Sequence, residues 1–145
     1  MEKLAIQITN YTKNRETIQS IRRQVFQVEQ GIDPELEFDG QDETADHLIA
    51  DWDGQPVGTA RLRALDRDRF KIERLAVLSI ARGRGIGKKL MQTALETAGD
   101  RGAREVVIHA QAYIKSLHQK LGFEQVGEPF EEAGIPHVKM RKILS

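Results

Sequence analysis

The chain is predicted to fold as one mixed α/β domain, residues 1–145, built around a single sheet. Two features of its segments lead to this prediction: strand-like and helical periods alternate along the chain, and three strand-like runs follow one another before the longest helical run. The third observation is length, because a chain of 145 residues buries roughly 70% of its unfolded surface and needs no second core.

The N-terminal part predicts a strand followed by a helix. Residues Leu4 to Ile8 alternate between apolar and polar side chains, which is the period of a half-buried strand. A polar break over 10–14 separates this strand from a helix predicted over 15–30, which Gly31 and Pro34 end. The apolar residues at helical spacing on one face of this helix are Ile18, Ile21, Val25 and Val28, with Phe26 beside them.

The middle of the chain predicts three strands and a long helix. His47–Ala50 and Pro56–Arg63 flank the turn Asp53-Gly54, which is a hairpin signal. Phe70–Leu78 is the third strand, and a helical stripe runs from Ile86 to about Gly99. The remaining predicted elements are strands over 106–108, 123–126 and 135–143 and a helix over 112–121.

Composition excludes several classes of function. Lys+Arg and Asp+Glu are equal at 22 each, so nothing favours a general nucleic-acid or membrane-surface role. The absence of cysteine excludes disulfides, thiolate zinc sites and a cysteine nucleophile. No apolar run approaches the roughly 18 residues that a membrane span needs. We therefore expect a soluble, cytoplasmic protein.

The segment Arg82-Gly83-Arg84-Gly85-Ile86-Gly87-Lys88-Lys89 connects the third strand to the long helix. Glycine permits a tight turn and a close approach of the backbone to a ligand, and the first turn of a helix presents free N–H groups. Basic residues at a helix N-terminus oppose the helix dipole unless an anion binds there. This segment therefore predicts a phosphate-binding loop.

The spacing of the glycines narrows the kind of loop. A Walker-type P-loop requires Ser or Thr after Gly-Lys, and Lys89 occupies that position. The dinucleotide fingerprint fits poorly, because Lys88 stands where its third glycine belongs and Glu105 precedes the next apolar run. The pattern that fits is Arg/Gln-x-x-Gly-x-Gly/Ala, which Arg82, Gly85 and Gly87 satisfy.

On this motif the chain resembles the GCN5-related N-acetyltransferase (GNAT) family, whose members bind the pyrophosphate of acetyl-CoA in that loop. Glu73-Arg74-Leu75-Ala76-Val77 before the loop and Leu121-Gly122-Phe123 after it strengthen the resemblance. The first helix and Gly134-Ile135-Pro136-His137 are similar to a bacterial subgroup of small acetyltransferases with unassigned substrates. The positions in the first helix that carry this similarity are Arg23, Val25, Phe26, Glu29 and Gln30.

The resemblance implies a single mixed, mostly antiparallel sheet flanked by helices, and acetyl transfer from acetyl-CoA to a primary amine of a small molecule or protein without a metal. It also implies that the backbone of the strand before the loop binds the pantetheine arm and polarises the thioester. The implied cofactor-binding residues are Leu75, Ala76, Val77, Arg82, Gly83, Arg84, Gly85, Ile86, Gly87 and Lys88. Arg82 and Arg84 are alternatively ordinary surface charges.

The candidate catalytic residues are Glu73, His118 and Tyr113. Glu73 is either the base or amine binder, or a strand carboxylate that pairs with a cation, with a water relay as an equal route. His118 occupies the position where many family members carry a tyrosine proton donor, and it is either a cationic donor or a surface histidine. Tyr113 lies about 500° away on a helical wheel and cannot replace it. His137 is a second donor candidate.

Three questions stay open at the level of sequence. The acidic segment Glu35–Glu43 is either a solvated loop or the rim of an acceptor pocket that attracts a cationic amine. Trp52 is expected to cover an edge of the core rather than to stack on adenine. The alternatives to an enzyme are an acetyl-CoA sensor without turnover and a generic phosphate or nucleotide binder. A homodimer is possible.

Overall fold

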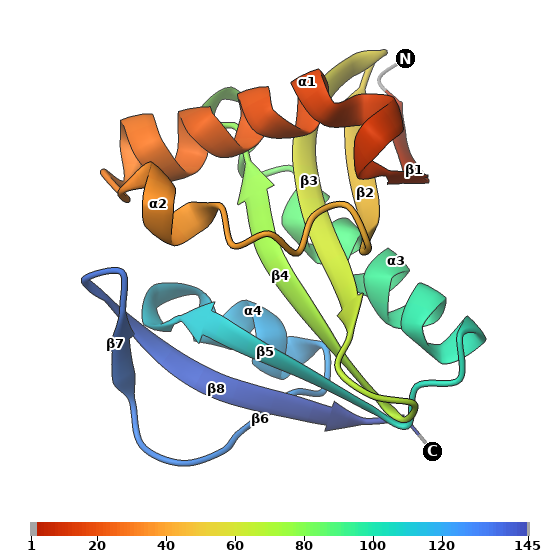
Figure 1. Ribbon diagram of the computed structural model, residues 1–145, viewed down its shortest axis with the longest axis vertical. Helices are drawn as coiled ribbons and strands as arrows, with labels where there is room; N and C mark the ends of the chain where they lie inside the picture. Colours follow the sequence, from red (N-terminus) through yellow and green to blue (C-terminus); the bar gives the residue numbers. More distant parts are fainter. Residues whose placement is uncertain (1–2, 145) are drawn as a thin grey trace.

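The computed structural model describes residues 3–144 and contains one eight-stranded sheet. The strand order is β1-β2-β3-β4-β5-β8-β6, and β7 pairs with β8 outside this path (Figure 1). Within the described residues, β4 and β5 form the single parallel pair, and the other six pairs are antiparallel. The predicted mixed, mostly antiparallel sheet flanked by helices is confirmed.

The strands and helices have the following bounds. The strands are β1 (Leu4–Asn10), β2 (Asp46–Trp52), β3 (Gln55–Ala64), β4 (Arg69–Val77), β5 (Glu105–Gln111), β6 (Glu124–Gln125), β7 (Phe130–Glu132) and β8 (Ile135–Ile143). The α-helices are α1 (Tyr11–Arg22), α2 (Pro34–Glu37), α3 (Ile86–Asp100) and α4 (Lys115–Lys120). The other helical segments are the π-helix η1 (Arg23–Glu29) and the 3₁₀ turns η2 (Ser79–Ala81) and η3 (Ala112–Ile114).

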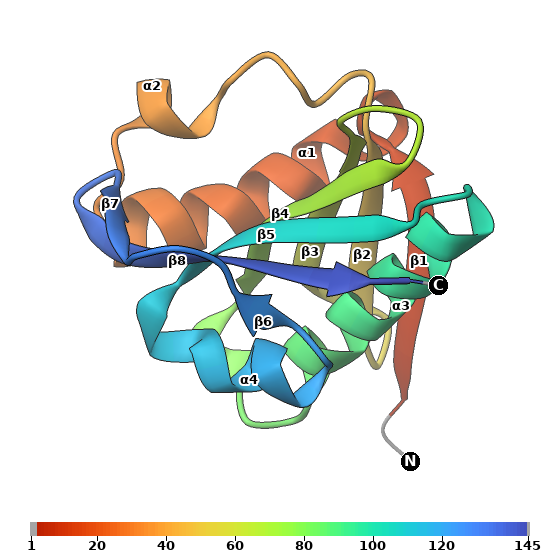
Figure 2. The ribbon, with the colours of Figure 1, turned by 90° about the horizontal axis from the view of Figure 1, so that it is seen from below.

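Helices cover both faces of the sheet. Figure 2 shows α1 and α2 on one side, called here the front face, and α3 and α4 on the other, called the back face. The main core lies between the sheet and α3, which explains why β3 carries Gly58: an added Cβ would stand 3.0 Å from Leu90 and 3.2 Å from the Ala76 carbonyl. In the described chain no helix is long and apolar enough to cross a membrane.

The first helix differs from its prediction. It begins at Tyr11 because the Asn10 side chain caps it by accepting a hydrogen bond from the Lys13 backbone N–H, so the predicted break over 10–14 is wrong. From Arg23 the helix has π-type winding, with i→i+5 hydrogen bonds. In this winding each residue turns through a smaller angle about the helix axis. Val28, three residues after Val25, therefore no longer lies on the buried face that Val25 occupies, and it is 65% exposed.

Four other segments also differ. The helix predicted over 112–121 is a 3₁₀ turn followed by the six residues of α4, and the strand predicted over 123–126 is reduced to the two residues of β6. The short strand β7 was not predicted. The acidic segment begins with the single turn α2, which Asp33 caps through the backbone N–H of Glu35.

Candidate active site

The site is a cleft of about 830 Å³ that opens where β4 and β5 separate. Their parallel ladder joins Arg69–Lys71 to Glu105–Val107 and continues no further within the described residues. Figure 1 shows the two strands diverging from this short paired segment. Side chains from beyond that point on both strands line the cleft, so it passes through the sheet and joins its front and back faces.

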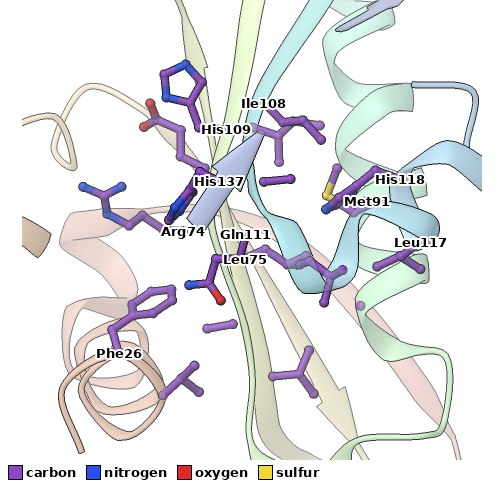
Figure 3. Close-up of a pocket in the computed structure, with 18 of the residues that line it drawn as sticks. Phe26, Arg74, Leu75, Met91, Ile108, His109, Gln111, Leu117, His118 and His137 are labelled. Carbon is purple, nitrogen blue, oxygen red and sulfur yellow. The ribbon is translucent and has the colours of Figure 1, made fainter. Parts of the chain in front are cut away.

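The close-up in Figure 3 shows how the cleft connects the two faces. Phe26, Arg74 and His137 lie on one side of the separated strands, and Met91, Leu117 and His118 lie on the other. Leu75 and Gln111 lie between these two groups. A ligand that fills the cleft would therefore contact both faces of the molecule at once.

A β-bulge shapes the part of β4 that borders the cleft. The register between β3 and β4 shifts between Thr59 and Arg61, and Arg74 adopts a left-handed φ of 56°. The bulge interrupts the simple alternation that placed Glu73, Leu75 and Val77 on one predicted face. Leu75, Ala76 and Val77 all line the cleft, and their edge toward β5 has no ladder partner in the described chain. Backbone groups on that edge are available to a ligand.

The glycine loop forms the back end of the cleft. Gly83 and Gly85 have φ of 81° and 76°, values that favour glycine over other residues. Gly85 precedes α3 without a side-chain cap, and the first turn of α3 contains no acidic residue. The N–H groups of this turn and the positive end of the helix dipole therefore face the cleft with Lys88 beside them.

The two arginines of the loop lie in different environments. Arg82 lines the cleft, forms an ion pair with Glu29 of η1, and donates from Nε to the Val77 carbonyl at 3.0 Å. Arg84 lies outside the cleft lining, with its guanidinium 5.0 Å from the ring centroid of Trp52. Trp52 packs against the main core, as expected of a residue that covers a core edge. The other predicted cofactor-binding residues all line the cleft.

Glu73 lines the cleft, but it is surrounded by cations. Its carboxylate accepts hydrogen bonds from Arg61 and Arg63, and Lys71 Nζ lies 3.3 Å away. Burial raises the pKa of the Glu73 carboxyl, but these partners outweigh burial and lower it to about 2. A carboxylate this acidic holds no proton at neutral pH and takes one up poorly, so the structure disfavours Glu73 as a base. The contacts instead match the alternative interpretation of Glu73, a strand carboxylate that pairs with cations.

The acidic segment Glu35–Glu43 is exposed along most of its length, as in a solvated loop, but two of its carboxylates are buried. Glu37 and Asp42 are buried and accept hydrogen bonds from Arg22, whose side chain is 1% exposed. Arg61 is also buried and donates to Asp42 and Asp39. Three carboxylates of this segment, Glu37, Asp39 and Asp42, are therefore paired with buried arginines. The segment does border the cleft, through Leu36, Glu37 and Asp39.

His118 projects into the cleft from α4, and both alternatives for its role need correction. It is 3% exposed, so it is not a surface histidine, and it packs edge-on against Phe123. Burial lowers its pKa to about 4, so it is not cationic at neutral pH. Its Nδ1 has no hydrogen-bond partner among residues 3–144. Tyr113 lies at the rim of the cleft and is 74% exposed.

Other residues in the cleft were missed at the level of sequence. Gln30, which follows η1, and Gln111 of β5 exchange two side-chain hydrogen bonds across the front face. His109 of β5 donates from Nδ1 to the Glu132 carboxylate of β7, 3.1 Å away. The alternation of polar His109 and Gln111 with apolar Ile108 and Ala110 was the signal for a polar front face. His137, which the sequence did offer as a second donor candidate, is buried beside them and donates from Nδ1 to the Ile135 carbonyl at 2.7 Å.

Comparison with known proteins adds an independent finding. A family model described as an acetyltransferase (GNAT) domain matches residues 10–144. The uncharacterized N-acetyltransferase YjcF of Bacillus subtilis is 34% identical over 135 residues, covering 90% of this chain and 95% of YjcF. Protein ElaA of Escherichia coli is 35% identical over 127 residues, covering 84% of this chain and 82% of ElaA.

Solved structures agree. The crystal structure of E. coli ElaA aligns with a TM-score of 0.85 at 29% identity, and that of an acyl-CoA N-acyltransferase from Pseudomonas aeruginosa with a TM-score of 0.83 at 32% identity; each covers 97% of this chain and 99% of the other. A more distant GNAT acetyltransferase from Elizabethkingia anophelis, crystallised with acetyl-CoA bound, shares the fold with a TM-score of 0.73 at 18% identity.

Proposed function

The chain belongs to the GNAT family and is an acyl-CoA-dependent acetyltransferase, and from this premise we propose that it transfers the acetyl group of acetyl-CoA to a primary amine by direct attack in a ternary complex. The observation that carries the proposal is the cleft through the sheet. A donor that enters from the back face and an acceptor that enters from the front face would meet between β4 and β5, with no need for an acetylated enzyme.

The residues on the back face suit acetyl-CoA. The N–H groups of Gly83 to Lys88 and the cationic side chain of Lys88 match a pyrophosphate, which needs several donors and positive charge. The free edge of Leu75, Ala76 and Val77 matches an arm of amide groups, which binds by adding to a strand edge. A backbone N–H on this edge would polarise the thioester carbonyl.

The acceptor side has an apolar wall. Val25, Phe26, Ile32 and Leu36 line the front part of the cleft, and the polar groups of Gln30, Gln111 and Arg74 lie near them. This lining favours a primary amine attached to an apolar body, as in an arylalkylamine or an apolar amino terminus of a peptide. The cations that pair with the acidic segment leave little negative charge for a polyamine.

The chemistry makes two demands on the side chains. The amine nitrogen forms a C–N bond with the carbonyl carbon, the C–S bond breaks, and its electron pair leaves on sulfur. The nitrogen must lose one proton and the sulfur must gain one. We assign the stabilisation of the departing sulfur to His118. Its neutral imidazole N–H donates a hydrogen bond to the thiolate. The sulfur then takes its proton from solvent.

His118→Phe is expected to leave acetyl-CoA affinity unchanged and to lower kcat about 10- to 100-fold, the value of a hydrogen bond to a charged group. Calorimetric titration measures the affinity, and the release of free thiol measures kcat. Tyr113→Phe serves as the comparison, because Tyr113 carries a hydroxyl at the rim of the same cleft. If Tyr113→Phe transfers slowly and His118→Phe transfers normally, Tyr113 rather than His118 stabilises the departing thiolate.

The first test of the whole proposal is a calorimetric titration with acetyl-CoA, with ATP and NAD as controls, followed by thiol release with 2-phenylethylamine, spermidine and an apolar tripeptide. We expect selective binding of acetyl-CoA and faster thiol release with the apolar amines. If acetyl-CoA binds but no amine releases thiol faster than water alone does, the protein is instead a sensor of acetyl-CoA. Preference for ATP or NAD would contradict the acetyl-CoA assignment.

A further inference from the structure

Three titratable side chains meet on the front face of the cleft, outside the groups used so far. They are His109 of β5, Glu132 of β7 and His137 of β8, and all three line the cleft. Glu132 lies between the two histidines: its Oε1 is 3.1 Å from His109 Nδ1, and its Oε2 is 3.7 Å from His137 Nε2. The ring of Phe130 packs against both imidazoles.

Local structure explains how the three side chains come together. In β5 the alternation that buries Ile108 and Ala110 toward α3 directs His109 to the front face. β7 and β8 form a tight hairpin whose turn residues, Ala133 and Gly134, both have positive φ, and this hairpin brings Glu132 back over the sheet. His109 is therefore supplied by a central strand and its carboxylate partner by a separate hairpin.

The hydrogen bonds fix which nitrogen of each ring carries a proton. A carboxylate accepts, so the 3.1 Å bond to Glu132 assigns a proton to His109 Nδ1, in preference to the longer 3.5 Å contact with the Lys71 ammonium, which would need a lone pair there. The lone pair of the neutral ring is then on Nε2. His137 donates from Nδ1 to the Ile135 carbonyl, and its Nε2 lies 3.7 Å from Glu132 Oε2.

The charged groups around His109 come from each neighbouring strand. Lys71 of β4 places Nζ 3.5 Å from His109 Nδ1, and Lys139 lies opposite His109 in the β5–β8 ladder. These ammonium groups oppose a second proton on the ring, whereas Glu132 favours it. The hydrogen bond from His109 lowers the pKa of Glu132, so the carboxylate is charged at neutral pH.

We propose, on the basis of the function proposed above, that His109 is the catalytic base that removes the proton from the acceptor amine, and that Glu132 is its positioning residue. The amine N–H bond breaks, the proton moves to Nε2, and the resulting imidazolium is stabilised by Glu132 until the proton passes to water. A base oriented through its other nitrogen by a carboxylate is the arrangement that general-base catalysis requires. Glu73, by contrast, already accepts from several cations.

The test compares wild type and His109→Ala on two acceptors with similar apolar bodies. The nitrogen of 2-phenylethylamine is protonated at neutral pH, whereas that of O-benzylhydroxylamine is not. With 2-phenylethylamine, His109→Ala is expected to lose about 100-fold or more in kcat/KM at pH 7, the usual contribution of a positioned base. With O-benzylhydroxylamine the loss should be much smaller. Acetyl-CoA affinity should be unchanged, and the fall in kcat/KM of the wild type at acid pH should disappear in the variant.

Glu132→Gln and Glu131→Gln form a matched pair for the positioning role. Both remove one charge from β7, but Glu131 lies outside the cleft lining. Glu132→Gln is expected to lower kcat with 2-phenylethylamine and to leave KM for acetyl-CoA unchanged, and Glu131→Gln to change neither. Nitrogen-15 NMR of the imidazole rings gives a readout apart from activity: His109 should carry its proton on Nδ1 in the wild type and should lose that preference in Glu132→Gln.

The outcomes separate this proposal from the one on which it rests. A wild type that binds acetyl-CoA but releases no thiol with any amine would overturn both. Active wild type with an equal loss on both acceptors in His109→Ala, or with no loss, would overturn the base assignment alone and leave the acetyltransferase function in place. A proton on Nε2 of His109 in the wild type would likewise exclude the proposed orientation.

Discussion

Gly85→Glu is expected to weaken acetyl-CoA binding by about 100-fold or more, because a like charge placed against an anionic group costs several kcal/mol. Gly85 immediately precedes α3, whose first turn has N–H groups without partners inside the helix. An added carboxylate there would compete with the pyrophosphate for those N–H groups and for the charge of Lys88. Calorimetric titration with acetyl-CoA measures the loss.

The control is Gly127→Glu, which places the same side chain on a similar backbone away from the cleft. Gly127 has a φ of 80° and Gly85 one of 76°, and an added Cβ meets no atom within 4 Å at either residue. The backbone strain, at about 1–2 kcal/mol, is therefore similar in both variants. Gly127 lies outside the cleft lining, so its variant should bind acetyl-CoA normally. Equal affinities in the two variants would contradict the loop assignment.

The local structural features of this protein could be predicted directly from its sequence. Alternating side chains predicted β1 and the hairpin of β2 and β3, and the glycines at 83 and 85 have the left-handed backbone that their loop required. These features depend on residues adjacent in sequence, for which periodicity and glycine geometry are sufficient. The cofactor side of the cleft was predictable for the same reason, since one loop and one strand supply most of it.

The acceptor side was harder to predict because its chemistry depends on residues distant in sequence. Glu73 changes from a candidate base to a paired anion only when Arg61 and Arg63 from β3 lie beside it. His109 acquires a role only through Glu132, 23 positions away on a different hairpin. Burial of His118 against Phe123 decides its protonation, and no pattern in the sequence states how deeply a short helix is packed.

Arg61→Met is expected to lower the free energy of unfolding by about 3–5 kcal/mol, the usual cost of removing one partner from a buried ion pair. Arg61 is fully buried and bonds to Asp39, Asp42 and Glu73. Methionine keeps much of the side-chain length but leaves these three carboxylates with fewer cations. Urea denaturation followed by circular dichroism measures the loss.

Arg101→Met provides the matched control. Arg101 pairs with Asp46 at 2.7 Å, but its side chain is 46% exposed, so its loss should cost less than about 1 kcal/mol. A similarly small cost for Arg61→Met would show that the buried carboxylates adapt without their arginine, for example by taking up protons. It would also mean that the ion network contributes little to the rigidity of the cleft.

Acid should remove the same stabilisation in the wild type. The pKa of Glu73 is about 2 in the folded protein, against an ordinary value of 4.5 that applies when it is unfolded. A carboxyl whose pKa is lowered by folding stabilises the fold fully above its unfolded pKa, and this contribution is lost as pH falls from 4.5 toward 2. Arg61→Met removes a cation that lowers this pKa, so its unfolding free energy should fall less steeply across that range. An equally steep fall would place the acid sensitivity in other carboxyl groups.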